Sequence, residues 1–409
     1  MAGTDAMNIH VARQPILDAN RNIVAYELLA RTGESNSFSG DPNIASVTAI
    51  ETTMLGFGLP MLIGKADGFF NASRELLTSQ RWKALPSGRS VLEVLETVEP
   101  DGDIVAACAA AKTAGYRIAL DDFVFRPEYE ALLPHVDIIK VDFMSTPADE
   151  RAAVAERYRS RGIVMLAEKI ETYQDFHEAV AAGYTLFQGY FFCRPEMVAT
   201  KDIPPSRLSL IRLIGEVNRP ELDMTSLERV ISHDVALSVR LLRYLRSAAL
   251  GWRHNVETIE QGLRTLGERQ ARQWASIVAL NLMGDEKPAA LMQATLLRAY
   301  FCEELATMLG MPTRQSEFFL TGLLSTLDAV LDRPMPTILG QMSLGGEAHA
   351  ALMGENIVLR DCLRAVAAYE RADWGAVDRF AARNDLDPSG VAEAYQRSLG
   401  RIADGAFAA

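Results

Sequence analysis

The chain has 409 residues, of which 49% are hydrophobic and 23% are charged. This composition is typical of a globular protein and excludes a disordered, collagen-like or coiled-coil chain, and the length leaves room for two or three domains. Acidic side chains outnumber basic ones 53 to 41, for a formal net charge of −12, which argues against a uniformly basic surface that binds nucleic acid.

The four cysteines lie far apart, and no two have the spacing of a zinc knuckle, as expected in a reducing compartment. The first residues lack the basic start and apolar core of a signal peptide. No apolar stretch reaches the roughly 18 residues of a membrane span. We therefore expect a cytoplasmic protein with no membrane partner.

The first 200 residues alternate short β-rich runs with helical segments. A polar turn at 19–22 separates the first two runs, which predicts an opening hairpin. Further runs lie at 68–72, 90–96, 117–123, 137–143, 163–170 and 185–192, with helical patterns at 103–115, 147–162 and 173–183. Because strand, helix and strand in succession imply parallel strands with right-handed crossovers, the pattern predicts a TIM-like (β/α) barrel over residues 1–200.

A segment with two prolines, residues 201–207, interrupts this pattern and predicts a linker. After it, apolar residues recur at three- and four-residue spacing. Helical patterns cover 226–248, 256–267, 268–284, 289–310 and 316–331. Residues 208–409 are therefore predicted to form an all-helical domain, so that the fold class is α/β followed by all-α.

Acidic residues lie in or at the ends of the apolar strands of the first domain: Glu27, Glu93, Asp121, Asp122 and Glu168. Charged groups there are costly to desolvate unless they are paired, protonated or bound to a cation. The carboxyl ends of the strands of a (β/α) barrel meet at one mouth. Oxygen ligands, with Asn71 as a neutral addition, favour Mg²⁺, Mn²⁺ or Ca²⁺ over zinc. The pattern predicts a divalent metal site at this mouth.

Lys140 and Gln188 also occupy strand ends. A lysine there would contact a phosphate ester bound to the metals and help to orient an attacking water. The alternative is that the acids form strand-end salt bridges with Arg13, Arg31, Lys140 and Lys169. Because polar residues recur at seven successive strand ends, we favour the metal site.

Seven segments of the first domain resemble, in order, the EAL domain, the family of cyclic-di-GMP phosphodiesterases. They read RQPILDANRNIVAYELLAR, FNAS, VLEVLE, IALDDF, IIKVDF, AEKIET and FQGYFFCRP, within residues 8–196. The resemblance implies a barrel that binds cyclic-di-GMP together with two divalent ions, Mg²⁺ or Mn²⁺.

The resemblance also implies a role for each matching residue. The metal ligands correspond to Glu27, Asn71, Glu93 and Asp121. The remaining metal and catalytic positions correspond to Asp122, Lys140 and Glu168, and the positions that contact the dinucleotide correspond to Gln14, Arg31 and Gln188. Glu96 and Glu171 match glutamates that anchor the loop after the two aspartates.

Three departures from the family pattern bear on activity. The signature reads Glu27-Leu28-Leu29, so a larger side chain follows the first ligand. The loop at 124–129 reads VFRPEY, without the usual glycines and serine, and Arg13 replaces an aromatic residue. A metal site whose supporting residues are changed loses turnover before it loses binding.

The second half resembles the HDOD domain, a helical relative of HD phosphohydrolases that lacks their metal residues. The resemblance covers 205–340 through SHDVALSVRLLRYLRSA, IEQGLRTLG, RQW and FFLTGLLSTLDAVL, and EAL followed by HDOD is a known pairing. His233-Asp234 could form an HD pair, but no suitably placed histidine and aspartate complete it. We expect Asp234 to cap a helix instead.

Three functions fit these features. We favour a cyclic-di-GMP signalling protein whose barrel binds nucleotide and metal with weak or no hydrolysis, and whose HDOD half contacts protein partners. The alternative is an active Mg²⁺- or Mn²⁺-dependent phosphodiesterase that converts cyclic-di-GMP to the linear dinucleotide pGpG. The third is a scaffold that uses neither ligand. A homodimer stays open, because the family dimerises through the loop region that is changed here.

Overall fold

The computed structural model describes residues 9–32, 58–196, 205–219, 222–245, 258–342, 344, 346–355 and 357–403. The chain divides into two compact units, residues 1–192 with 368–379 and residues 193–367 with 380–409. Most of the predicted linker lies outside the described residues, and Pro205–Arg207 already begin helix α7 (Pro205–Val217). The sequence predicts one boundary near residue 200, and it gives no sign that residues 368–379 belong to the first unit.

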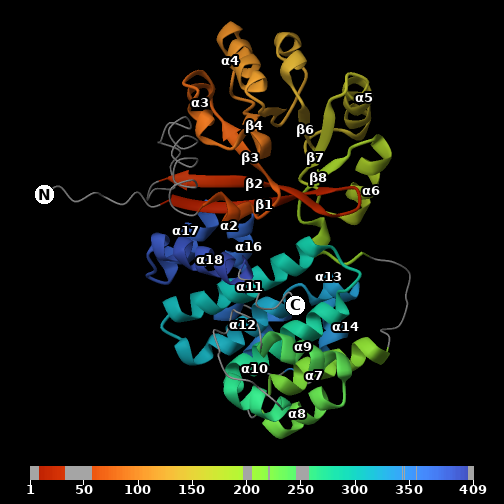
Figure 1. Cartoon of the computed structure of the whole chain (residues 1–409), viewed down its shortest axis with the longest axis vertical. Coiled ribbons are helices and arrows are strands. Elements are labelled where there is room, and N and C mark those ends of the chain that lie inside the picture. The colour runs from red at the N-terminus through yellow and green to blue at the C-terminus, as the bar shows by residue number, and fades with distance from the viewer. Residues whose placement is uncertain are drawn as a thin grey trace, which may run out of the picture. The chain divides into compact units, whose positions relative to one another are not determined.

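The first unit is built on a closed eight-stranded barrel, which confirms the predicted fold (Figure 1). The first strand is antiparallel to both of its neighbours, and the other neighbouring strands are parallel. The strands are β1 (Ile9–Asp18), β2 (Ile23–Thr32), β3 (Asp67–Ala72), β4 (Ser90–Val94), β5 (Arg117–Leu120), β6 (Ile138–Asp142), β7 (Val164–Glu168) and β8 (Leu186–Gln188).

Helices on the outside of the barrel connect the parallel strands (Figure 1). They are α2 (Leu59–Ile63), α3 (Arg74–Thr78), α4 (Gly102–Thr113), α5 (Ala148–Arg159) and α6 (Tyr173–Ala182). Helix α6 shows why these segments are helical: Thr172 and Asp175 form a capping box at its start. Gly183 ends it with a φ of 94°, the left-handed conformation that glycine adopts without strain.

A layer of apolar side chains fills the inside of the barrel. Each strand contributes one residue to it: Ile16, Ala25, Phe69, Val91, Ala119, Ile138, Leu166 and Leu186. Because side chains alternate between the two faces of a strand, the residue two positions further along points into the barrel as well. This layer therefore sets the inward direction of the residues that follow it at the mouth.

The second unit is helical, as predicted. Helix α10 packs against α7, α8 and α9, and α11 packs against α12 and α18. The remaining helices are α8 (Met224–Ser232), α9 (Val235–Leu245), α10 (Ile259–Met283), α11 (Ala289–Met308), α12 (Gln315–Leu324), α13 (Leu327–Leu331), α14 (Met335–Leu339), α15 (Gly346–Leu352), α16 (Val358–Glu370), α17 (Trp374–Arg383) and α18 (Pro388–Ala403).

One helix boundary differs from the sequence-based prediction. The pattern at 226–248 predicted one helix, but α8 ends before His233 and α9 begins after Asp234, whose carboxylate accepts a hydrogen bond from the Leu237 amide at 3.1 Å. This confirms Asp234 as a helix cap. The two patterns that meet at Gly267 together make up α10, in which the non-helical φ of 74° and ψ of 166° at that glycine separate the two helical segments that the sequence predicts.

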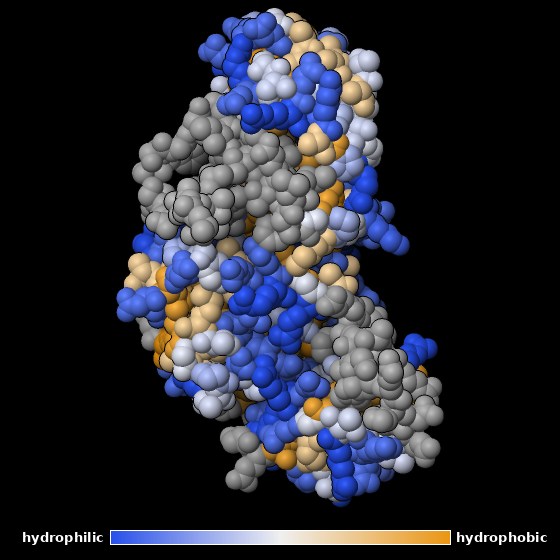
Figure 2. Space-filling model, turned by 60° about the vertical axis from the view of Figure 1, so that its left-hand side comes forward, coloured by the Kyte–Doolittle hydropathy of each residue, from blue (hydrophilic) through white to orange (hydrophobic). Residues whose placement is uncertain are grey.

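No described helix is both long and apolar enough to cross a membrane. Figure 2 shows hydrophilic side chains interspersed with smaller apolar areas on the face that it draws. Among the large apolar side chains, Val124 and Met144 are each 70% exposed. Both follow the carboxyl ends of strands of the barrel, at the mouth where the polar residues lie.

Candidate functional site

A polar layer lies directly above the apolar layer of the barrel. Each of its members follows a residue of the apolar layer by two positions along the chain. The seven members are Glu27, Asn71, Glu93, Asp121, Lys140, Glu168 and Gln188. The barrel thus brings together residues that are up to 161 positions apart in the sequence.

Lys140 is the central residue of this layer. Its side chain is fully buried, and its Nζ lies 2.7 Å from Glu168 Oε1, 3.0 Å from Asp121 Oδ1 and 3.5 Å from Glu27 Oε2. It also donates a hydrogen bond to Glu93. The salt-bridge alternative is therefore present in part, because one lysine contacts four of the acidic residues.

A single ammonium does not balance four carboxylates. Burial, reinforced by the nearby charges of Glu168 and Glu27, raises the pKa of Asp121 to about 9. Burial also raises the pKa of Glu168, although Lys140 opposes the shift. Burial alone would lower the pKa of Lys140, but Glu168 and Glu27 outweigh it and raise that pKa. If all four carboxylates were ionised, Lys140 alone could not neutralise them, so the site favours binding a further cation or protons.

Several buried oxygens of the layer also have no hydrogen-bond partner among the described residues. They are Asn71 Oδ1, Glu93 Oε2, Glu168 Oε2 and Gln188 Oε1. Buried polar atoms are normally paired, and carbonyl and carboxylate oxygens are the ligands of hard divalent cations. One oxygen each of Glu27, Glu93 and Glu168 lie within 4.8 Å of one another. These residues therefore fit a divalent metal.

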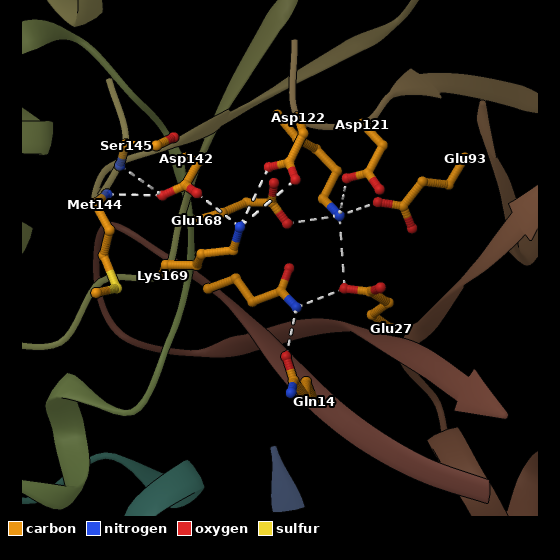
Figure 3. Close-up of polar contacts among 12 residues, drawn as sticks. Gln14, Glu27, Glu93, Asp121, Asp122, Asp142, Met144, Ser145, Glu168 and Lys169 are labelled. Atoms are coloured by element: carbon orange, nitrogen blue, oxygen red, sulfur yellow. Dashed lines mark hydrogen bonds and ion pairs between the residues drawn. The ribbon is translucent and has the colours of Figure 1, made fainter. Parts of the chain in front are cut away.

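A second acidic group adjoins the first, made by Asp121, Asp122 and Glu168 (Figure 3). Lys169 reaches this group from the residue after β7: its Nζ lies 2.6 Å from Asp142 Oδ2 and 3.5 Å from Asp122. Asp122 and Lys169 both have positive φ, 39° and 55°, a conformation uncommon for residues with a side chain. The mouth of the barrel thus carries a second, half-exposed ammonium beside its acids.

Gln188 connects Glu27 to the residues expected to contact a nucleotide. Its Nε2 donates to Glu27 Oε2 at 2.6 Å and to Gln14 Oε1 at 2.9 Å (Figure 3). Gln14 donates in turn to the carbonyl oxygen of Glu370, which belongs to the same unit. Arg31 lies further along β2, where it is paired with Asp378 of that unit.

The residues expected to anchor the loop after Asp122 lie outside the polar layer. Glu96 is exposed, and its carbonyl oxygen accepts a 3.4 Å hydrogen bond from Arg126 in that loop. Arg126 also donates to Tyr129 Oη at 2.8 Å. Glu171 is half-buried between β7 and α6. The anchoring role of both glutamates stays a prediction.

The change in the EAL signature does not narrow the site. Leu28 follows Glu27 on a strand, so its side chain points to the opposite face of β2, where it is 6% exposed. Arg13 likewise points away from the polar layer: it donates to the carbonyl oxygen of Leu62 and lies over the ring of Tyr26. Neither departure therefore places a side chain in the polar layer.

Sequence reasoning gave no role to three residues that contact this set. Asp142 is in the IIKVDF motif, and its place at the end of β6 was a signal that could have identified it as the partner of Lys169. Glu370 and Asp378 carry no such signal, because their contacts with Gln14 and Arg31 span 356 and 347 positions.

In the second unit, the candidate residue His233 makes local contacts with helix α8. His233 is exposed, and its Nδ1 lies 2.7 Å from the carbonyl oxygen of Arg229. Both groups of acids that could hold a metal among the described residues belong to the barrel. The most buried acid of the helical unit, Glu303, is paired with Arg269, Gln273 and Arg401.

Comparison with solved structures gives partial matches. The manganese and cyclic-di-GMP complex of Klebsiella pneumoniae BlrP1 matches 47% of this chain and 57% of its own, at 23% identity and a TM-score of 0.38. The EAL domain of Mycobacterium smegmatis DcpA matches 44% of this chain and 90% of its own, at 20% identity and a TM-score of 0.36.

Relatives and a family model match far more closely. The model of the HDOD domain matches residues 203–337. The cyclic di-GMP phosphodiesterase CdgJ of Vibrio cholerae is 34% identical over 377 residues, 90% of this chain and 87% of its own. The uncharacterized protein YuxH of Bacillus subtilis is 30% identical over 402 residues, 96% of this chain and 98% of its own. With these relatives along nearly its whole length, a closed barrel in its first half and an HDOD domain in its second, the chain belongs to the family of EAL–HDOD proteins.

Proposed function

We propose that the barrel binds cyclic-di-GMP together with divalent metal ions, and that the protein acts in cyclic-di-GMP signalling. The observation that carries this proposal is the set of unpaired buried oxygens on Asn71, Glu93 and Glu168, gathered at one mouth with a surplus of negative charge. The name of its relative CdgJ, a cyclic di-GMP phosphodiesterase, supports the choice of nucleotide.

Glu27, Asn71, Glu93 and Asp121 would hold the first metal, and Asp121, Asp122 and Glu168 would hold a second, with Mg²⁺ or Mn²⁺ suited to these oxygens. When bound, such a metal supplies Lewis-acid chemistry: it polarises a phosphoryl oxygen and lowers the pKa of a bound water.

The chain's own residues account for nucleotide recognition. Gln14 and Gln188 offer amide groups beside Glu27, and Arg31 offers a guanidinium suited to a phosphate. Lys140 lies at the centre of the layer and forms ion pairs with Asp121 and Glu168, which hold these acids together. Its ammonium would be free to face a phosphate once a metal took over the charge of Glu27 and Glu93.

The helical unit would carry the signal onward. Both groups of acids that could hold a metal among the described residues lie in the barrel, and none lies in the HDOD domain. We propose that the HDOD domain contacts protein partners. A homodimer through the loop after Asp122 is a further part of the proposal, with the exposed Val124 and Phe125 as the side chains available for it.

Calorimetry on the full chain tests the binding proposal. We expect cyclic-di-GMP to bind in the presence of Ca²⁺ or Mn²⁺ and not in EDTA, and Glu27→Gln to weaken binding while the variant keeps its fold. Gln is the matched change because it keeps the volume and the hydrogen bond from Gln188. Absence of both metal and nucleotide binding in the wild type would leave only the scaffold function.

Hydrolysis of cyclic-di-GMP to pGpG is the second candidate. The chain keeps all seven polar-layer residues, and the Leu28 side chain points away from them. Both observations favour turnover in spite of the altered signature. In that reaction, Glu168 and Lys140, 2.7 Å apart, would position the attacking water, and the carboxylate of Glu168 would accept its proton. Chromatography of the products with Mg²⁺ or Mn²⁺ decides: linear product from the wild type and none from Glu27→Ala establishes an enzyme, and intact nucleotide in both samples excludes hydrolysis.

A further inference from the structure

Residues 368–379, here called the cover segment, lie against the barrel strands that are expected to bind the nucleotide, within one compact unit. Two aromatic ring contacts join this segment to strand β1. Tyr369 and Trp374 have their ring centroids 6.4 and 5.8 Å from that of the fully buried His10 on β1. The two aromatic rings also pack edge to face on each other, 5.1 Å apart.

Polar contacts tie the cover segment to the same strands. The carbonyl oxygen of Glu370 accepts hydrogen bonds from Tyr190 Oη at 2.6 Å and from Gln14 Nε2 at 3.2 Å. Gln14 is bonded to Gln188, and Gln188 to the candidate ligand Glu27. A chain of hydrogen bonds therefore runs from the backbone of the segment to the metal site.

The strongest contact is the one between Asp378 and Arg31. It is bidentate: the Nη1 and Nη2 atoms of Arg31 lie 2.6 and 2.7 Å from the two carboxylate oxygens. The side chains are only 15% and 18% exposed, and the Arg31 guanidinium also lies 5.6 Å from the centroid of the Trp374 ring. A guanidinium binds a phosphate through the same planar pair of donors that Asp378 occupies.

We propose that the cover segment is a built-in competitor of the nucleotide, in which Asp378 takes the place of a phosphate on Arg31. This inference rests on the proposed nucleotide binding and adds its regulation. Nucleotide binding would require the Asp378 carboxylate to leave Arg31. The segment continues at both ends into residues of the second unit, so changes in that unit would act on Arg31 through Asp378.

The test compares the full-length wild type with Asp378→Asn, which keeps the shape of the side chain and removes its charge. Calorimetry measures cyclic-di-GMP binding with Ca²⁺, and hydrogen exchange follows the peptide that contains 368–379. If the open segment is populated about one tenth of the time, the variant binds about tenfold tighter. Exchange of the segment should rise in the variant alone and in the wild type when nucleotide is added.

Two further variants separate competition from general loosening. Tyr190→Phe removes a bond to Glu370 without touching Arg31, and we expect faster exchange with a smaller gain in affinity. Asp361→Asn removes the acid of an exposed pair with Arg364 in α16 and should change neither quantity. Thermal melting shows whether Asp378→Asn folds. If it does not fold, Tyr190→Phe replaces it in the same binding and exchange measurements.

The outcomes distinguish this inference from the function on which it rests. If the wild type binds nucleotide, Arg31→Ala abolishes binding, and Asp378→Asn changes neither affinity nor exchange, the competition is disproved and the proposed function stands. If no variant binds nucleotide, even with the segment exchanging freely, both are disproved.

Discussion

Lys140 on β6 and Glu168 on β7 form a buried ion pair with Nζ and Oε1 2.7 Å apart, at the centre of the acidic layer of the barrel. The register of the two strands aligns Lys140 with Leu166, so the long side chain of Lys140 reaches up to the level where the acids gather. The same ammonium also lies 3.0 Å from Asp121. In the metal-free protein, this one positive charge keeps several carboxylates together.

Replacement of Lys140 by Met should destabilise the metal-free protein by about 3–5 kcal/mol, because it leaves buried carboxylates without their cation. Urea unfolding in EDTA measures this free energy, and Mn²⁺ should restore part of it by supplying another cation. Lys112→Met is the control, since Lys112 pairs with Asp137 where both side chains are over a quarter exposed and such a pair contributes about 1 kcal/mol or less. Equal losses in the two variants would contradict the central role of Lys140.

The metal-free protein should lose stability as the pH rises from about 4 to about 9. The pKa of Asp121 is raised from 3.8 to about 9, chiefly by burial and then by Glu168 and Glu27, so the folded state holds a proton that the unfolded state releases. Each such proton lowers the unfolding free energy by up to about 1.4 kcal/mol per pH unit. Glu168, whose pKa is also raised, adds in the same direction.

Urea unfolding in EDTA at several pH values measures this slope. Asp121→Asn should reduce it, and Asp149→Asn, exposed on α5, should leave it unchanged. Stability that rises with pH over this range in the wild type would show that the acids stay ionised without metal.

Asn71→Leu should weaken Mn²⁺ binding by about tenfold or more without destabilising the metal-free protein. The Oδ1 atom of Asn71 is buried and has no partner among the described residues, so its removal gives up no hydrogen bond. Asn218→Leu is the opposite case, because Asn218 donates to Ile214 and Ser276. That variant should lose about 1–3 kcal/mol of stability and keep its metal affinity. Calorimetry with Mn²⁺ and urea unfolding give the two readouts.

The sequence was sufficient to predict the polar layer because its members obey local rules. Glu93 and Asp121 each stand at the end of an apolar run, and the barrel places strand ends together whatever their distance along the chain. The same reasoning could not find Asp378 as the partner of Arg31, because its helix carries no pattern that distinguishes the residue facing the barrel. The face of β2 to which Leu28 points, by contrast, follows from strand alternation once the strand is predicted.

Lys169→Gln should tighten Mn²⁺ binding about two- to fivefold, since the ammonium competes with a metal for Asp122 and an exposed charge pair contributes about 0.5–1 kcal/mol. Gln keeps most of the length of the side chain and removes its charge. Lys83→Gln is the control, because Lys83 is exposed and bonded to Gln80. Weaker Mn²⁺ binding by Lys169→Gln than by the control would show that Lys169 supports the site rather than competes with it.

The His233-Asp234 pair of the helical unit should prove structural. Asp234→Ala removes the side-chain acceptor of the Leu237 amide at the start of α9 and should cost about 1 kcal/mol of unfolding free energy. Asp234→Ser should restore most of that loss, because serine caps a helix about as well as aspartate but does not replace it as a carboxylate metal ligand. Urea unfolding measures both effects, and calorimetry should give the wild-type affinity for Mn²⁺ in both variants. If Asp234→Ser kept the stability but lost metal from the second unit, the pair would be a metal site and the helical half a candidate enzyme in its own right.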